Sequence, residues 1–113
     1  MTPPEYTHDV TIENNRIAPR RVWLEPWAEE LFIEPGASIV LNATGTAPGQ
    51  LEIEHQVDCD IVFGWPTSSL KVFKDEIMIW KSWAPHPPVP GGFTSKTFVK
   101  RLFGSGDERS EQG

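Results

Sequence analysis

The chain has 113 residues, of which 38% are apolar, and this is enough for one small domain but not for a second core. Five Trp and six Phe exclude a disordered chain, and no apolar run approaches the ~18 residues of a membrane span. Ten Lys and Arg stand against 16 Asp and Glu, and this net charge of −6 disfavours nucleic acid as a partner, because phosphate contacts need basic side chains.

Short runs of alternating apolar and polar residues follow a flexible N-terminus over residues 1–6. They predict eight strands, at residues 7–13, 21–25, 30–34, 38–42, 50–55, 58–65, 70–73 and 77–80. Turn residues separate several of them, namely Asn14-Asn15, Pro35-Gly36 and Lys74-Asp75-Glu76. Strands spaced by about 8–12 residues are typical of an antiparallel sandwich or barrel.

The alternation also predicts which side chains face the core. Leu51 and Ile53 share one face of their strand, and Cys59, Ile61 and Phe63 share one face of the next. We therefore expect one common core that contains Leu51, Ile53, Cys59, Ile61, Phe63 and Val72. The polar side chains between them are expected to face outward, namely Glu52, Glu54 and Asp60.

The pattern changes in residues 84–103, which begin with four Pro and two Gly in nine positions and predict an extended strap. Residues 94–103 fit either a short amphipathic helix or a closing strand, and residues 104–113 are expected to be a disordered tail. The apolar side chains of this extension need cover, on the same sandwich or on a second copy. Exchange between two copies is the arrangement we expect, with an interface through Phe98, Leu102 and Phe103.

The single Cys and the three His form no recognisable metal or catalytic motif. Cys59 has no second Cys for a disulfide, and no two His have the spacing that aims both rings at one ion. A triad of Ser68, His55 and Asp58 is conceivable, but the GxSxG nucleophile motif is absent. We therefore expect no catalytic residue, no metal and no cofactor.

Trp residues and paired carboxylates define a candidate ligand site. An exposed Trp can stack on a sugar ring, and two carboxylates on one sheet face stand within the ~5–10 Å that glycosidases use. The candidate residues are Trp23, Trp27, Trp65, Glu52 and Glu54. So many Trp can equally fill the core or form a subunit interface.

Two runs, VTIENNRIAPRRVWLEPW and LFIEPGASIVLNA, resemble cupredoxin-like sandwiches in their order of strands, Asn, Pro and Pro-Gly turn. Together with Gly64-Trp65-Pro66, they also resemble small uncharacterised bacterial β-sandwich proteins. The resemblance implies a fold and no activity, because the copper ligands of the cupredoxins are absent.

These features together predict an all-β protein, an antiparallel sandwich of seven or eight strands over residues 7–83. Its topology is expected to be cupredoxin-like or immunoglobulin-like, followed by the Pro-rich extension. We expect a cytoplasmic, non-catalytic binding or protein-interaction module that forms a homodimer and has neither nucleic acid nor membrane as partner. The alternative is a carbohydrate-binding or hydrolytic sandwich that uses exposed Trp and Glu side chains.

Overall fold

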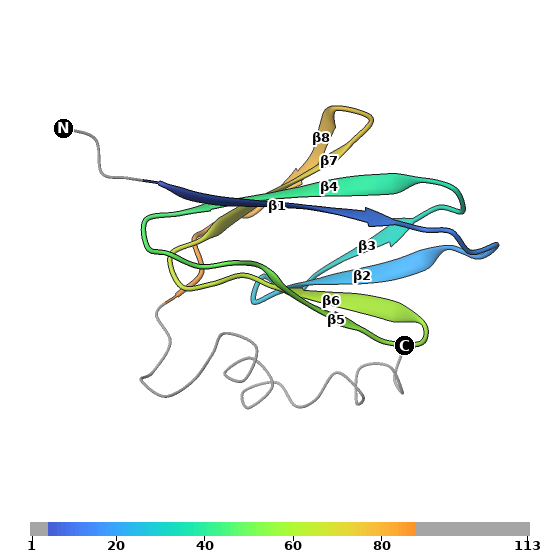
Figure 1. The fold of residues 1–113 in the computed structure, drawn as a ribbon, viewed down its shortest axis with the longest axis horizontal. Helices are drawn as coiled ribbons and strands as arrows, with labels where there is room; N and C mark the ends of the chain where they lie inside the picture. Colours follow the sequence, from blue (N-terminus) through green and yellow to red (C-terminus); the bar gives the residue numbers. More distant parts are fainter. Residues whose placement is uncertain (1–4, 88–113) are drawn as a thin grey trace.

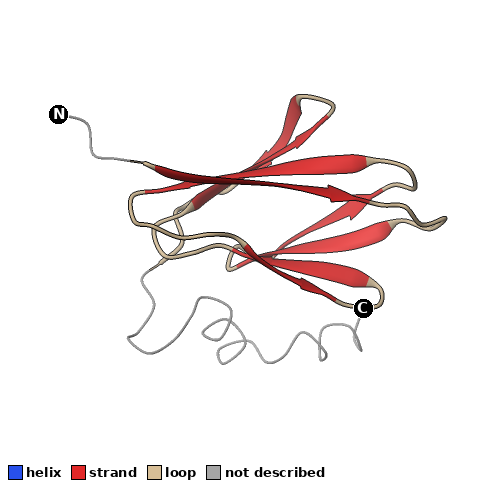
Figure 2. Cartoon of the chain, in the orientation of Figure 1, coloured by secondary structure: helices blue, strands red, loops and turns tan. Residues whose placement is uncertain are grey.

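The computed structural model of the chain describes residues 5–87 and confirms the predicted all-β sandwich. Two four-stranded sheets pack face to face (Figures 1 and 2). The strands are β1 Tyr6–Glu13, β2 Arg20–Glu25, β3 Glu29–Ile33, β4 Ser38–Gly45, β5 Glu52–His55, β6 Cys59–Phe63, β7 Ser69–Lys74 and β8 Ile77–Lys81. No helix within residues 5–87 is long and apolar enough to cross a membrane. The predictions for residues 94–103 and for the tail lie outside the described residues.

The two sheets differ in the direction of their strands. One has the order β1-β4-β7-β8 and is antiparallel throughout. The other has the order β3-β2-β6-β5, and its central strands β2 and β6 run parallel, with Trp23 opposite Ile61. Parallel strands normally lie where both faces of a sheet are covered, and every residue of β6 is buried.

Two of the predicted turns have the backbone geometry that their position in the chain requires. Gly36 has a φ of +79°, and the N–H of Ala37 donates to the carbonyl oxygen of Glu34 at 3.0 Å, which makes a type II turn between β3 and β4. Asp75 and Glu76 both have positive φ, 51° and 66°, and connect β7 to β8. Positive φ at both central residues matches the right-handed twist of a two-residue hairpin.

The core between the sheets draws its buried members from six strands and the loops between them, and Ile53 of β5 and Trp80 of β8 pack against it. Its buried members are Ile12, Val22, Leu24, Trp27, Ile33, Ile39, Leu41, Ala43, Leu51, Val62, Trp65, Leu70 and Val72. Leu51 and Val72 lie in this core and Ile53 packs against it, as predicted.

The core prediction is wrong for β6. Cys59, Ile61 and Phe63 are buried, but they form a second cluster, separate from the core between the sheets. Val62 belongs to the core instead, and Asp60, expected to face outward, is only 1% exposed. The physical reason is the parallel pairing with β2, which places β6 in the middle of its sheet and lets it bury side chains on both faces.

Gly49 lies directly against the indole of Trp65, so its lack of a side chain is required by packing. A Cβ at this position would lie 2.1 Å from Cγ of Trp65. The indole N–H donates to the carbonyl oxygen of Ala47 at 2.8 Å, and this bond holds the β4–β5 loop on the ring. Trp65 is 4% exposed and cannot move aside into solvent.

We expect Gly49→Ala to lower the free energy of unfolding by about 1–3 kcal/mol through overpacking of Trp65. Urea denaturation followed by circular dichroism measures this loss. Pro48→Ala, at the neighbouring position, is the matched control. Equal midpoints for the two variants would contradict the contact.

Candidate binding face

The sheet β3-β2-β6-β5 carries a mixed apolar and acidic surface on the face turned away from the other sheet. The strand register arranges its side chains in rows across the sheet, one of which runs from Trp23 through Ile61 to Glu54. The next row runs from Glu25 through Phe63 to Glu52. We call this surface the outer face, and it consists of Arg21, Trp23, Glu25, Glu30, Phe32, Glu52, Glu54, Cys59, Ile61 and Phe63.

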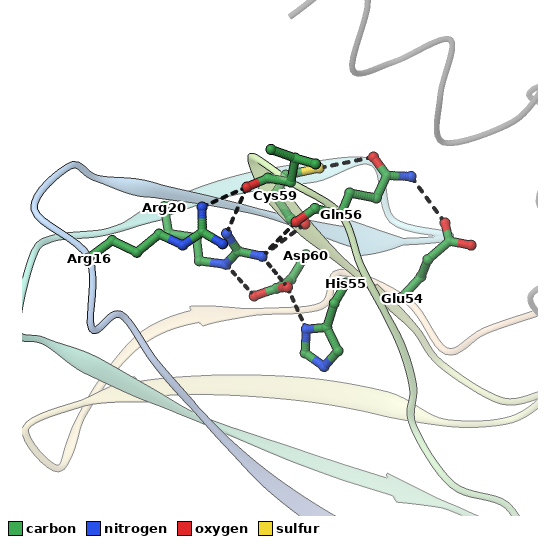
Figure 3. Close-up of polar contacts among 8 residues, drawn as sticks. Arg16, Arg20, Glu54, His55, Gln56, Cys59 and Asp60 are labelled. Atoms are coloured by element: carbon green, nitrogen blue, oxygen red, sulfur yellow. Dashed lines mark hydrogen bonds and ion pairs between the residues drawn. The ribbon is translucent and has the colours of Figure 1, made fainter.

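The centre of the outer face is apolar and buried. Cys59, Ile61 and Phe63 are 2%, 1% and 2% exposed, and Trp23 packs against them while half-buried. Beside this centre, next to the β5–β6 turn, the side-chain amide of Gln56 accepts a hydrogen bond from the Cys59 thiol at 3.4 Å and donates one to Glu54 at 3.2 Å (Figure 3). The cluster is therefore packed as a second, smaller core.

The edges of the outer face are acidic. Arg21 is its single cation among the described residues, and its Nε lies 3.0 Å from the carboxylate of Glu30. The same guanidinium lies 6.0 Å from the ring centre of Trp23 and 5.9 Å from that of Phe32. Glu52 and Glu54 add two carboxylates along the β5 edge, so the charge of this edge favours a partner with positive charge.

A buried ion pair fixes the end of the outer face where β6 begins. Nε and Nη2 of Arg20 donate to the two carboxylate oxygens of Asp60 at 2.9 and 2.8 Å, and Nδ1 of His55 lies 2.6 Å from the same carboxylate (Figure 3). Nη2 of Arg20 also donates to the carbonyl oxygens of Gln56 and Cys59 at 3.0 and 3.2 Å. Arg20 thus ties β2 to the turn between β5 and β6.

The charges of this pair stabilise each other. Burial opposes ionisation of Asp60, but the hydrogen bonds from Arg20 and His55 outweigh it, and the pKa of the carboxyl is lowered. The same hydrogen bond from Arg20 to Asp60 raises the pKa of the guanidinium. Asp60 is therefore a carboxylate at neutral pH, and both members of the pair are charged.

The arrangement of His55 and Asp60 resembles the base and orienting acid of a hydrolase, but the conceivable triad of Ser68, His55 and Asp58 is not assembled. His55 pairs with Asp60 and lies near the start of β6, whereas Ser68 lies beyond the end of β6 and accepts a hydrogen bond from the N–H of Trp65. A cavity of about 370 Å³ beside His55 is lined by the β1 edge, without Ser or Cys. Among residues 5–87, no three His, Cys, Asp or Glu side chains are grouped to hold a metal ion.

The structure divides the residues of the predicted ligand site between two places. Trp23, Glu52 and Glu54 lie together on the outer face. Trp27 and Trp65 are 6% and 4% exposed in the core, where their indole N–H groups donate to the carbonyl oxygens of Ala84 and Ala47. The interface residues expected in the extension lie outside the described residues, at Phe98, Leu102 and Phe103.

Part of the outer face does not follow from the sequence pattern. Alternation predicts Ile61 and Phe63 for the core between the sheets, and it does not mark Arg21, Glu25 or Phe32 as site residues. The available signal was the run Ile61-Val62-Phe63, which is apolar at consecutive positions and is typical of a strand buried on both faces. Comparison with known protein families, curated proteins and solved structures finds no match.

The last described residues are anchored beside Trp27, beyond the ends of β2 and β6. The N–H of His86 donates to the carbonyl oxygen of Ser68 at 2.8 Å, and the N–H of Thr67 donates to that of His86 at 3.1 Å. The imidazole of His86 is 2% exposed and meets Trp27 edge to face. Burial lowers the pKa of His86 below its ordinary value of 6.5, and backbone hydrogen bonds only partly oppose this.

We expect the stability of the protein to fall between pH 7 and pH 5 because of His86. Because its pKa is lowered in the native state, His86 takes up a proton in the unfolded chain first as the pH falls. The contribution of the neutral imidazole to stability is therefore complete above about pH 6.5 and is lost as the pH falls toward the native pKa. Each unit of difference costs ~1.4 kcal/mol. Thermal unfolding of the wild type and of His86→Gln at both pH values measures the effect. An equal loss in both proteins would contradict it.

Proposed function

We propose that the chain is a small, non-catalytic binding module whose outer face binds a polypeptide segment with apolar and basic side chains. The observation that supports this proposal is the second apolar cluster, Cys59, Ile61 and Phe63, on a sheet face with carboxylates at its edge. Apolar anchors at the centre of an interface supply affinity, and complementary charge at its rim supplies specificity and rate. The proposal places this module in the bacterial cytoplasm, where the single thiol of Cys59 stays reduced.

Charge supports a basic partner in particular. Residues 1–70 include strands β1 to β6 and the start of β7. They carry 11 acidic and 3 basic side chains, which gives a net charge of −8. Glu52 and Glu54 come from the edge strand β5, so they can meet side chains that approach along that edge. Such contacts are screened by salt, with a Debye length of about 8 Å at physiological ionic strength.

A peptide titration tests the proposal. The probe is a fluorescein-labelled nonapeptide in which Lys alternates with Phe or Leu, and its anisotropy is followed as the full chain is added. We expect saturable binding that Glu52→Lys with Glu54→Lys weakens at least tenfold. Glu13→Lys with Glu34→Lys makes the same charge change away from the outer face and is the control. Equal binding by both double variants, or no binding at all, would overturn the proposal.

The expected homodimer is an intermolecular form of the same contact. In it, the basic and apolar extension of each copy would bind the outer face of the other. Sedimentation velocity of the full chain between 1 and 100 µM measures this association. A single monomeric species over that range would remove the dimer from the proposal.

Carbohydrate binding is the second candidate function. One observation favours it, because half-buried Trp23 shares a row with Glu54, and Glu52 lies in the next row. An indole beside carboxylates can stack on a sugar ring and accept its hydroxyl hydrogen bonds. Calorimetric titration with cellohexaose and chitohexaose tests this class of ligand. Binding that is abolished by Trp23→Ala and is insensitive to salt would favour the carbohydrate over the peptide.

A further inference from the structure

The side chains at the centre of the outer face are less exposed than the described strands explain. The other sheet packs on the opposite side of β2 and β6, and no strand among residues 5–87 lies over the outer face (Figure 1). The one partly buried hydrophobic residue that packs against the cluster in this range is Trp23. Trp23 lies opposite Ile61, whereas Cys59 and Phe63 lie two residues to either side along β6, so one indole does not account for the burial of all three side chains.

Several polar groups of the face also have interaction partners. Trp23, Glu25 and Glu54 each have an interaction partner. Glu25 is 1% exposed although it lies on the outer face, in the row with Phe63. Because a carboxylate is costly to bury without partners, a face that hides both Glu25 and Phe63 is a covered interface.

The described chain ends at the edge of this face. Pro87 follows His86, which is held by Ser68 and Trp27 just beyond the ends of β2 and β6. The nearest row of the outer face contains Glu25 and Phe63, which are the last residues of these two strands. From Phe63 to Cys59 the face is about 13 Å long, at ~3.3 Å per strand residue.

The segment that follows, residues 88–103, has the chemistry and the length to cover the face. It contains three basic side chains and no acidic one, with six large apolar side chains: Val89, Phe93, Phe98, Val99, Leu102 and Phe103. Sixteen residues reach about 50 Å in a polyproline conformation, several times the length of the face. The extension therefore matches the outer face in charge and in apolar character.

We propose that residues 88–103 bind the outer face of their own chain and compete there with an external partner of the same chemistry. A short tether gives the segment an effective concentration in the millimolar range, above the concentration of any second copy in solution. Docking within one chain is thus favoured over the exchange between copies expected from sequence. The inference rests on the proposed function only for the external partner. The binding of residues 88–103 to the outer face is inferred from the burial of that face.

The single thiol of the protein reports on this cover, because Cys59 is part of the buried cluster. The experiment follows the rate of reaction of the full chain with Ellman's reagent at pH 8. We expect slow labelling of the wild type and at least tenfold faster labelling of Phe98→Asp with Leu102→Asp, residues that share a face in either a helix or a strand. Ser105→Asp with Ser110→Asp adds the same charge in the tail and should label as slowly as the wild type.

Two further measurements decide between one chain and two, and separate cover from unfolding. Labelling of the wild type at 1 and 100 µM protein should proceed at the same rate, whereas faster labelling on dilution would assign the cover to a second copy and overturn the inference. Circular dichroism of the Phe98→Asp, Leu102→Asp chain should retain the β spectrum, because the core between the sheets is intact. Rapid labelling of the wild type, or equal rates for both double variants, would also overturn the inference.

The labelled nonapeptide separates this inference from the proposed function. We expect it to bind the Phe98→Asp, Leu102→Asp chain at least tenfold more tightly than the wild type, because the competing segment is displaced. A protected Cys59 with no peptide binding to either chain would leave the cover in place and overturn the proposed function. Equal peptide binding to both chains, with rapid labelling of Cys59, would support the function and overturn the cover.

Discussion

Asp60→Asn is expected to lower the free energy of unfolding by about 3–5 kcal/mol, a large part of the stability of a small domain. The variant leaves the guanidinium of Arg20 buried, at 9% exposure, without its carboxylate. It also weakens the hold of Arg20 on the β5–β6 turn, where its Nη2 donates to the carbonyl oxygens of Gln56 and Cys59. Urea denaturation measures the loss.

A control tests whether the cost arises from the uncompensated charge. The double variant Arg20→Met with Asp60→Leu removes both charges and should be nearly as stable as the wild type. The pH dependence gives a second test. Because the native pKa of Asp60 lies below its ordinary value of 3.8, its contribution is complete above about pH 4 and is lost as the pH falls through the native pKa. This acid-dependent loss should disappear in Asp60→Asn, and its persistence would contradict the assignment.

Phe63→Ala is expected to cost about 3–5 kcal/mol, as for a phenylalanine in a closed core. Phe63 is 2% exposed on the outer face, in the row between Glu25 and Glu52. Phe32→Ala, on the same face but at 57% exposure, should cost less than about 1 kcal/mol. The two midpoints of urea denaturation give the comparison. Equal small losses would mean that the outer face is open to water around Phe63.

Alternation of side chains was sufficient to predict eight strands and most of their turns, because strand period and turn chemistry are local properties. Pro35-Gly36 predicted its own type II turn, and Lys74-Asp75-Glu76 predicted the hairpin between β7 and β8, whose two loop residues are Asp75 and Glu76. The faces of β6 were not predictable in this way. Its apolar residues occur at consecutive positions, and the choice between its two faces depends on β2, about 40 residues earlier in the chain.

Only some residues of the candidate site could be predicted from the sequence. Glu52 and Glu54 were correctly placed on one face by alternation, and Trp23 was among the candidates because of its residue type. That these three share a face follows from the parallel register of β2 and β6, which no local pattern encodes. Trp27 and Trp65 have the same residue type as Trp23, but the loops at Ala84 and Ala47 bury them through hydrogen bonds that the sequence does not reveal.

The parallel pairing of β2 with β6 has a consequence for how the chain reaches its native state. Trp23 and Ile61 are neighbours in the sheet, yet 38 residues separate them, so a long loop must close before the middle of this sheet exists. Sandwiches dominated by such distant pairings fold in milliseconds to seconds, much more slowly than helical bundles of similar size. The ribosome adds ~5–20 residues per second, so β2 and β3 emerge several seconds before β6. During this time their apolar side chains have no strand β6 to pack against. This interval is when the nascent chain is most exposed to aggregation.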